Sequence, residues 1–321
     1  MACCFPARGA RLFAAALFSG LLPSVCLAAA GSADVVRLAE SGFTVKVPQA
    51  ATVPFRGMVN ADRAGMAGGP VLYPAPGLAG FLAAIATHGV LVESSRSSEK
   101  SRQQVEADRV LEPYARTLSE LSHGDLLERA LAGLNLPPGA ARLVAADATP
   151  TGWVLESLPT FTMSQDRSAL VLDNAVVVYA ADQVKTPRLQ TLVRVVSHLR
   201  KPAETPAMPA SLAPAASDAG KVTFAAPSDD GQVVRDSVDL MATSLRVVLD
   251  ELARDGAPAE AKPRTFRYRE GATARMERGQ LVQYRCDRLV IRTLRGWLMS
   301  VPVQPGEELD LGSPCVASPA Q

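Results

Sequence analysis

Apolar and polar positions alternate in several stretches of the chain, and each such stretch predicts a strand. The run Phe43–Val47 has an apolar side chain at every second position, which is the period of a half-buried strand. Two β-rich runs, 152–163 and 169–180, lie on either side of the polar residues 164–167, which fit a hairpin connection. The run 189–200 fits either a strand or a helix, and its β-branched valines favour a strand.

The last part of the chain repeats this two-residue alternation over residues 264–303. Its first segment alternates arginines with Phe266 and Tyr268, and further β-rich runs follow. Turns are predicted near Gly279, Asp287 and Gly296. We therefore expect a first strand and then two or three more, all paired antiparallel.

A period of three to four residues predicts helices elsewhere. Residues 94–121 carry one apolar stripe, and Pro113 is expected to kink or divide this helix. Ser122 is predicted to cap a further helix, because its hydroxyl can accept a hydrogen bond from a free amide of the first turn. Residues 231–256 are apolar along one face and end at a glycine, which predicts a long amphipathic helix.

The segment 77–92 is apolar on nearly every side and rich in glycine and alanine. A segment of this kind is either a buried core helix or a membrane-inserted one. It is short for a membrane span and contains His88. We therefore favour a buried helix over membrane contact through residues 77–92.

A change in composition divides the chain after residue 200. Residues 201–230 are rich in proline and alanine and have few bulky apolar side chains, which predicts a linker or a mobile surface loop. The expected fold is α+β, with a helical run and small, mostly antiparallel sheets in two parts joined by this linker. The amino-terminal part is 31–200 and the carboxy-terminal helix-plus-sheet part is 231–321. The pattern leaves open whether the two parts share one sheet.

The first thirty residues predict where the protein works. Arg8 and Arg11 precede an apolar run, and small residues follow up to Ala30. This is the layout of a secretory signal peptide. Residues 1–30 are thus expected to be cleaved near Ala30, and the mature chain to reach the periplasm or outer envelope of a bacterium. Lipidation at Cys26 and a retained membrane anchor are the two alternatives.

Export changes the interpretation of the cysteines. Cys286 and Cys315 remain in the mature chain, and an even number of cysteines in an oxidising compartment predicts a disulfide. Their bridge would close a loop of about thirty residues and contribute roughly 3–4 kcal/mol. Two free buried thiols are the alternative.

The charge balance matters mainly in one segment. The whole chain has a formal net charge of +1 and 5% aromatic residues, which gives no case for a nucleic-acid partner. Between Arg264 and Arg295, however, nine arginines stand against three acids. Arginines on one face would offer forked donors to phosphate or carboxylate, whereas arginines that alternate outward and pair with acids would be structural. The candidate anion-binding residues are Arg267, Arg269, Arg275, Arg278, Arg285, Arg288, Arg292 and Arg295.

Signatures of catalysis or metal binding are missing from the sequence. We find no G-x-S-x-G, H-E-x-x-H, Walker A or G-x-G-x-x-G pattern, so no cofactor and no metal are predicted. The histidines are His88, His123 and His198, and a Ser-His-Asp triad assembles in space rather than in sequence. A secreted hydrolase with such a dispersed site is therefore the alternative function.

The preferred function is non-enzymatic. We predict an exported envelope protein that acts as a binding or scaffold component and presents a basic sheet face to an anionic partner. The partner classes that suit guanidinium groups in this compartment are anionic lipid, lipopolysaccharide and an acidic envelope protein.

Overall fold

The computed structural model of the chain describes residues 42–50, 52–59, 97–200, 230–254, 262–285 and 287–303. All of them belong to one unit, Gly31–Gln321. The predicted signal peptide (1–30), the apolar segment 77–92, residues 201–229 of the predicted linker, and both Cys286 and Cys315 lie outside the described residues. The predictions made for them are not tested by the structure.

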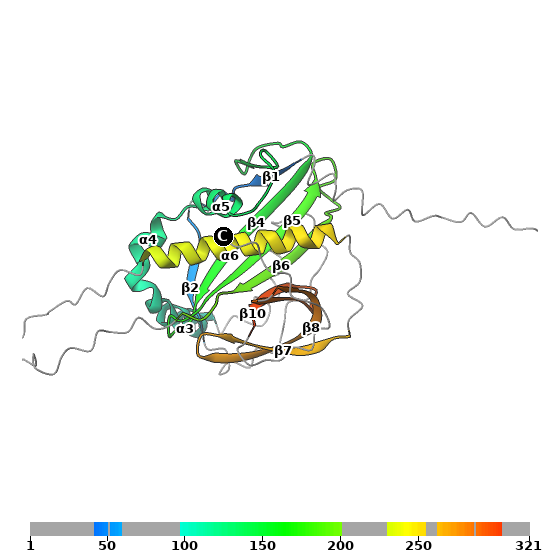
Figure 1. Cartoon of the computed structure of the whole chain (residues 1–321). Coiled ribbons are helices and arrows are strands. Elements are labelled where there is room, and N and C mark those ends of the chain that lie inside the picture. Colours follow the sequence, from blue (N-terminus) through cyan, green and yellow to red (C-terminus); the bar gives the residue numbers. More distant parts are fainter. Residues whose placement is uncertain are drawn as a thin grey trace, which may run out of the picture. The chain divides into compact units, whose positions relative to one another are not determined.

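A single mixed sheet of ten strands forms the framework of the described residues (Figure 1). Along the sheet the strand order is β3-β1-β4-β5-β6-β10-β9-β8-β7, and β2 pairs with β4 beside this path. The strands are β1 (Phe43–Lys46), β2 (Phe55–Gly57), β3 (Ala141–Val144), β4 (Trp153–Met163), β5 (Leu170–Ala180), β6 (Leu189–Val196), β7 (Arg264–Glu270), β8 (Thr273–Arg285), β9 (Arg288–Thr293) and β10 (Leu298–Pro302).

The α+β class is confirmed, but the prediction of small, mostly antiparallel sheets is wrong. Strand β6 pairs in parallel with β10, which places Val193 opposite Leu298. Strand β1 also pairs in parallel with both β3 and β4. Local alternation identifies strands but contains no information about partners that lie about a hundred residues away. The strands before and after residues 201–229 therefore continue one sheet.

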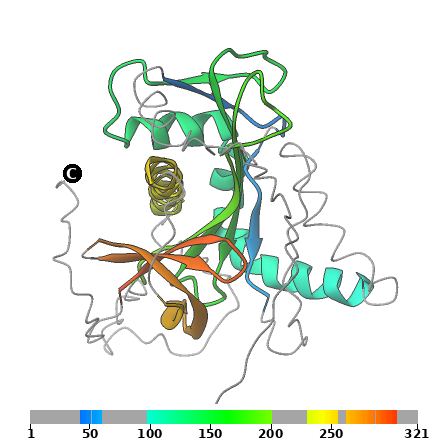
Figure 2. The same cartoon turned by 90° about the vertical axis from the view of Figure 1, so that its right-hand side faces the viewer.

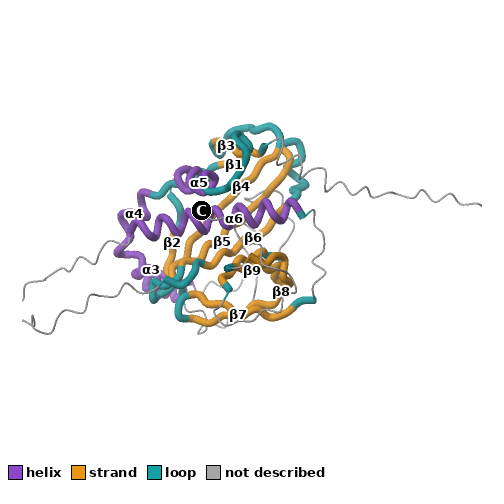
Figure 3. Tube along the Cα trace, in the orientation of Figure 1, coloured by secondary structure: helices purple, strands orange, loops and turns teal. Residues whose placement is uncertain are grey.

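The helices begin and end close to their predicted bounds. The predicted helix over 94–121 consists of α3 (Ser97–Asp108), the 3-10 segment η2 (Arg109–Tyr114) and α4 (Ala115–Glu120). Pro113 lies inside η2, as expected for a residue that cannot donate the i→i−4 hydrogen bond. Ser122 caps α5 (His123–Ala132), because its hydroxyl accepts a hydrogen bond of 3.0 Å from the amide of Asp125. Figure 3 shows α3 and α4 beside one end of the sheet.

The long helix α6 (Asp230–Ala253) covers one face of the sheet and makes the main core. Figure 1 shows it running across β4, β5 and β6, and Figure 2 shows it end-on, on the same side of the sheet as α5. Its apolar stripe, which includes Val233, Met241 and Val248, packs against alternate residues of β5 and β6. This helix was predicted from its 3.6-residue period, and the prediction is confirmed.

A polar contact lies inside this core. Asn174 of β5 has no solvent-exposed surface. Its side-chain oxygen accepts a hydrogen bond of 2.8 Å from the Ser157 hydroxyl, and its side-chain nitrogen donates one of 3.1 Å to Ser244 of α6. Because unsatisfied polar groups are costly in a core, this contact ties α6 to the sheet at one position along the helix.

Strand β8 corrects the predicted turn near Gly279. The chain turns at Gly271 and Ala272 instead, and β8 continues through Gly279 up to Arg285. Up to Gly279 the strand pairs with β7, and from Gly279 onward it pairs with β9. A Cβ on Gly279 would lie 2.4 Å from the carbonyl oxygen of Arg292. Glycine at this position thus permits a close approach of two strands and does not mark a turn.

The β7–β8 hairpin packs on the side of the sheet that faces away from α6. Phe266 and Tyr268 of β7 form a second apolar cluster with Val171 of β5 and Val196 of β6. In β5 the neighbours of Val171, at positions 170 and 172, belong instead to the core under α6. Because side chains alternate between the faces of a strand, the hairpin covers the opposite face.

Candidate functional site

The outward side of the β7–β8 hairpin presents three of the predicted arginines to solvent. Burial alternates strictly along β7, where Phe266, Tyr268 and Glu270 are buried. The residues between them, which include Arg267 and Arg269, are exposed. Arg278 of β8 is exposed as well. The alternation that identified the strand therefore also decides which of its arginines reach solvent.

The register of the hairpin brings these three arginines together. Thr265 pairs with Arg278, Arg267 with Met276, and Arg269 with Ala274. Paired residues share a face, and diagonal neighbours on one face lie about 7–8 Å apart at the backbone. A similar distance, about 7 Å, separates positions i and i+2 along one strand. The three guanidinium groups are therefore close enough to contact one phosphate-bearing surface together.

Two apolar side chains belong to the same surface. Met276 is 69% exposed and Leu294 is 63% exposed. The amide of Leu294, in the turn after β9, donates a hydrogen bond of 3.2 Å to the carbonyl oxygen of Arg278. This continues the pairing in which Gly279 faces Thr293, so Leu294 stands opposite Arg278. We refer to Arg267, Arg269, Met276, Arg278 and Leu294 as the basic face.

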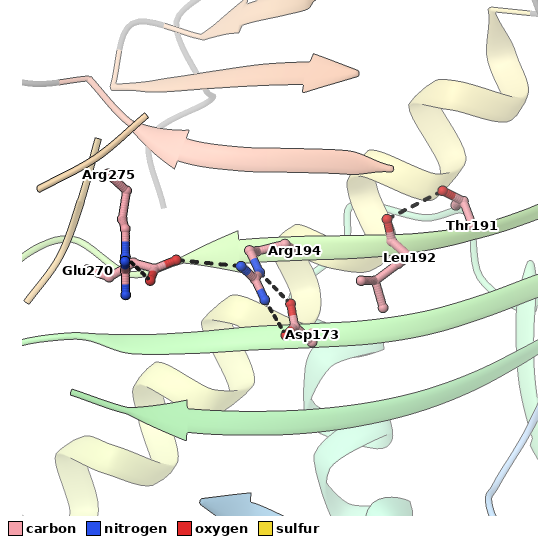
Figure 4. A network of polar contacts seen from close by, with 6 residues as sticks. All are labelled: Asp173, Thr191, Leu192, Arg194, Glu270 and Arg275. Carbon is pink, nitrogen blue, oxygen red and sulfur yellow. Dashed lines mark hydrogen bonds and ion pairs between the residues drawn. The ribbon is translucent and has the colours of Figure 1, made fainter. Parts of the chain in front are cut away.

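The acids of the hairpin point to its other side. Glu270 is buried, and its carboxylate lies 3.7 Å from Nη1 of Arg194 and 3.3 Å from Nε of Arg275 (Figure 4). Arg194 also donates two hydrogen bonds, of 2.6 and 2.7 Å, to Asp173. The hydrogen bonds and charge of Asp173, together with the charge of Glu270, raise the pKa of Arg194 against the opposing effect of its burial. Arg275 thus belongs to an internal network and does not share the basic face.

Two more of the predicted arginines bind acids of α6. Arg285 forms an ion pair with Asp250, and Arg292 forms one with Glu251. Arg254, at the end of the same helix, lies 3.6 Å from Glu251. These contacts attach the carboxy-terminal end of α6 to β8 and β9. No local pattern in the sequence pairs residues 250 and 285, so sequence reasoning could not separate these arginines from the exposed ones.

The last two predicted arginines have structural surroundings of their own. Arg288 is buried and donates hydrogen bonds of 2.9 Å to the Ser300 hydroxyl and 2.6 Å to the carbonyl oxygen of Val196. Burial lowers the pKa of Arg288 to about 10, so the side chain is still charged at neutral pH. Arg295 is exposed, and its guanidinium lies 5.1 Å from the centre of the Trp297 ring, within range of a cation–π contact.

The histidines considered for catalysis occupy separate places. His88 lies outside the described residues, and His123 is buried in α5, where desolvation lowers its pKa. His198 lies in an open groove of about 890 Å³ beside α6, with its Nε2 3.5 Å from a carboxylate oxygen of Asp287. Burial is the main reason that the pKa of His198 is lowered. Among the described residues no serine hydroxyl forms a hydrogen bond with His198, so this pair lacks a nucleophile.

The described residues contain neither a cluster of metal ligands nor a membrane-spanning helix. In the described part of the chain, no three His, Cys, Asp or Glu side chains gather closely enough to hold a metal ion. No helix of the described residues is both long and apolar enough to cross a membrane. No family model, curated protein or solved structure matches this chain. The basic face is therefore the candidate site that the described residues support best.

Proposed function

We propose that the protein is an exported envelope component that binds an anionic partner through the basic face. The observation that carries this proposal is the segregation of charge across the hairpin. Three guanidinium groups share the outward side, whereas Glu270 and Glu277 alternate to the inward side. The outward positions of the paired strands, from Thr265 to Arg269 and from Ala274 to Arg278, contain no acid.

The arginines that form ion pairs with acids support this proposal, because the arginines of the basic face differ from them. An arginine that serves the fold has an acid beside it, as Arg275, Arg285 and Arg292 do. The side chains of Arg267 and Arg278 form no ion pair or hydrogen bond with any described residue. Solvated guanidinium groups that are held on a rigid hairpin are well placed to bind phosphate or carboxylate without reorganisation.

Export is the second half of the proposal and depends on residues 1–30, where arginines, an apolar run and small residues follow in the order of a signal peptide. Expression of the full chain in a Gram-negative host tests it. We expect the protein in the periplasmic or envelope fraction, with an amino terminus near Gly31 by mass spectrometry. An intact amino-terminal methionine on protein from the cytosolic fraction would refute the export.

Binding to an anionic partner is tested with beads coated with lipopolysaccharide, at low and at high salt. We expect retention that decreases with salt, because exposed charges are screened within about 8–10 Å at physiological ionic strength. The variant Arg267→Gln/Arg269→Gln/Arg278→Gln should lose retention. A matched control is Arg116→Gln, which removes an exposed arginine of α4 that lies 3.5 Å from Glu120. If the triple variant and the wild type are retained equally, the basic face is not the binding site.

A further inference from the structure

We infer that the basic face docks onto the surface of a membrane, with Met276 and Leu294 entering the interface while the three arginines contact lipid phosphates. This inference deepens the proposed function and depends on it, because it assigns the anionic partner to phosphate-bearing amphiphiles. Phospholipid and lipopolysaccharide share that chemistry, since both place phosphate groups directly above acyl chains.

The first observation is the exposure of large apolar side chains among the charges. Met276 stands opposite Arg267 in the hairpin register, and Leu294 stands opposite Arg278 through the hydrogen bond between their backbones. Both side chains are more than half exposed. To bind a soluble acidic protein, the basic face would need only its positive charges. Apolar side chains between cations are instead typical of surfaces that bind at a membrane interface.

The second observation is that the fold does not use these side chains. The apolar cluster beneath the hairpin consists of residues from the inward side, among them Phe266 and Tyr268. Neither Met276 nor Leu294 belongs to that cluster or to the core under α6. Their removal from the surface should therefore leave the described fold intact.

The third observation is that the guanidinium groups stay on the basic face and do not turn towards nearby acids. Asp166, in the connection between β4 and β5, approaches the turn of the hairpin, since a Cβ on Gly271 would lie 2.6 Å from its carboxylate. Arg269 instead donates to the carbonyl oxygens of Gly271 and Ala272, at 3.4 and 2.8 Å. These bonds hold the Arg269 side chain at the turn end of the face and use only part of its five donors.

Charge on β7 has a competing explanation, because β7 is the last strand of the described sheet order. Charged side chains on an edge strand oppose its pairing with another chain. If that were their only role, replacing the arginines would produce oligomers and would leave membrane binding unchanged. The oligomeric state of each variant is therefore measured together with its membrane binding.

The experiment measures partition of the full exported protein onto vesicles of phosphatidylcholine alone and of phosphatidylcholine with phosphatidylglycerol. We expect binding only to the anionic vesicles. Each Arg→Gln change on the basic face should lower the partition coefficient about fivefold, since one cation near an anionic surface contributes about 1 kcal/mol. The variant Met276→Ser/Leu294→Ser should lower it about tenfold, because two apolar side chains lose their burial. The matched control Val105→Ser, at a residue of α3 that is 67% exposed, should bind like the wild type.

Insertion is measured separately with Met276→Trp. Its fluorescence should shift to shorter wavelength on anionic vesicles and should be quenched by brominated acyl chains. If Met276→Ser/Leu294→Ser binds like the wild type and the new tryptophan stays unquenched, the membrane inference is wrong. In that case salt-sensitive retention on lipopolysaccharide, lost in the triple arginine variant, would still support the proposed function. If the triple variant forms oligomers on size exclusion and its vesicle binding is unchanged, the membrane inference is likewise wrong. The arginines would then serve to prevent β7 from pairing with another chain.

Discussion

Arg194 and Asp173 face each other on neighbouring strands, and the guanidinium donates to both carboxylate oxygens at 2.6 and 2.7 Å. Arg194 lies at the centre of the network in Figure 4, because Glu270 of β7 approaches it at 3.7 Å from the other side. The arginine thus connects the central strands to the hairpin that displays the basic face.

The first prediction concerns this connection. Arg194→Leu should lower the free energy of unfolding by about 3 kcal/mol, because it leaves the partly buried carboxylate of Asp173 without its cation and the buried Glu270 with Arg275 alone. Urea unfolding of both proteins measures the difference. Arg116→Leu, which removes an exposed pair on α4, should change stability by about 0.5 kcal/mol or less. Equal effects of the two substitutions would show that the network contributes nothing beyond an exposed ion pair.

The second prediction concerns the polar contact beneath α6. Asn174→Ala removes the partner of both Ser157 and Ser244 and leaves a small cavity. The expected loss is about 2–3 kcal/mol, since buried polar atoms become unsatisfied. Asn135→Ala is the matched control at an exposed position and should cost about 0.5 kcal/mol or less. A neutral Asn174→Ala would mean that α6 packs on apolar contacts alone.

The third prediction concerns the close approach of β8 and β9. Gly279→Ala would place a methyl group 2.4 Å from the Arg292 carbonyl oxygen, so the strands must separate, at a cost of about 1–3 kcal/mol. Thermal unfolding should show a lower midpoint. The same substitution at Gly124, in the first turn of α5, would place its Cβ in ordinary contact with the Ser122 hydroxyl oxygen at 3.7 Å and should be neutral or slightly stabilising. If Gly279→Ala also proves neutral, the close approach is not a constraint.

The fourth prediction concerns pH. His123 is buried, and desolvation lowers its pKa while the backbone at Thr52 partly opposes this effect. The unfolded chain therefore binds more protons than the folded one, so stability is complete above about pH 6.5 and decreases as the pH falls below it. Urea unfolding between about pH 7.5 and pH 5.5 should show this loss, and His123→Leu should reduce it.

A control for the pH dependence is available at His198. Its side chain is 58% exposed, so solvent screening leaves it a small contribution to the dependence. His198→Gln should consequently keep most of the wild-type change with pH. An unchanged pH dependence in His123→Leu would contradict the assignment to His123.

The fifth prediction concerns the cysteines, which lie outside the described residues. If Cys286 and Cys315 are joined in the exported protein, alkylation without reduction should leave both unmodified by mass spectrometry. Cys315→Ser should then cost roughly 3–4 kcal/mol, as expected for a loop of about thirty residues. Alkylation of both thiols in the native protein would show that no bridge forms.

Short-range pattern was enough to predict most of the individual elements. The Ser122 cap, the helix interruption at Pro113 and the apolar face of α6 depend on residues within a few positions of each other. The order of strands does not, because the pairing of β6 with β10 joins residues about a hundred positions apart. Gly279 shows the same limit, since a glycine at a strand crossing looks in sequence like a glycine in a turn.

The candidate site was predictable only in part. Strict alternation in β7 was readable and correctly implied that Arg267 and Arg269 face one way. The ion pairs of Arg285 and Arg292 depend on acids of α6 that no local spacing connects to them. Met276 and Leu294 were not recognised as part of the site. Met276 and Arg278 are two positions apart in β8 and therefore share a face. This spacing was the signal in the sequence that could have identified Met276.

The pairing of β6 with β10 has a consequence for how this chain can be divided. A single backbone cut between residues 200 and 230 would produce two pieces that are still joined by the pairing of β6 with β10, in which Val193 lies opposite Leu298, and by the core under α6. The two pieces of such a nicked protein should elute together on size exclusion until the protein is denatured. In a truncated piece that stops at residue 200, β6 would instead be an edge strand with unpaired backbone groups, and the piece should aggregate.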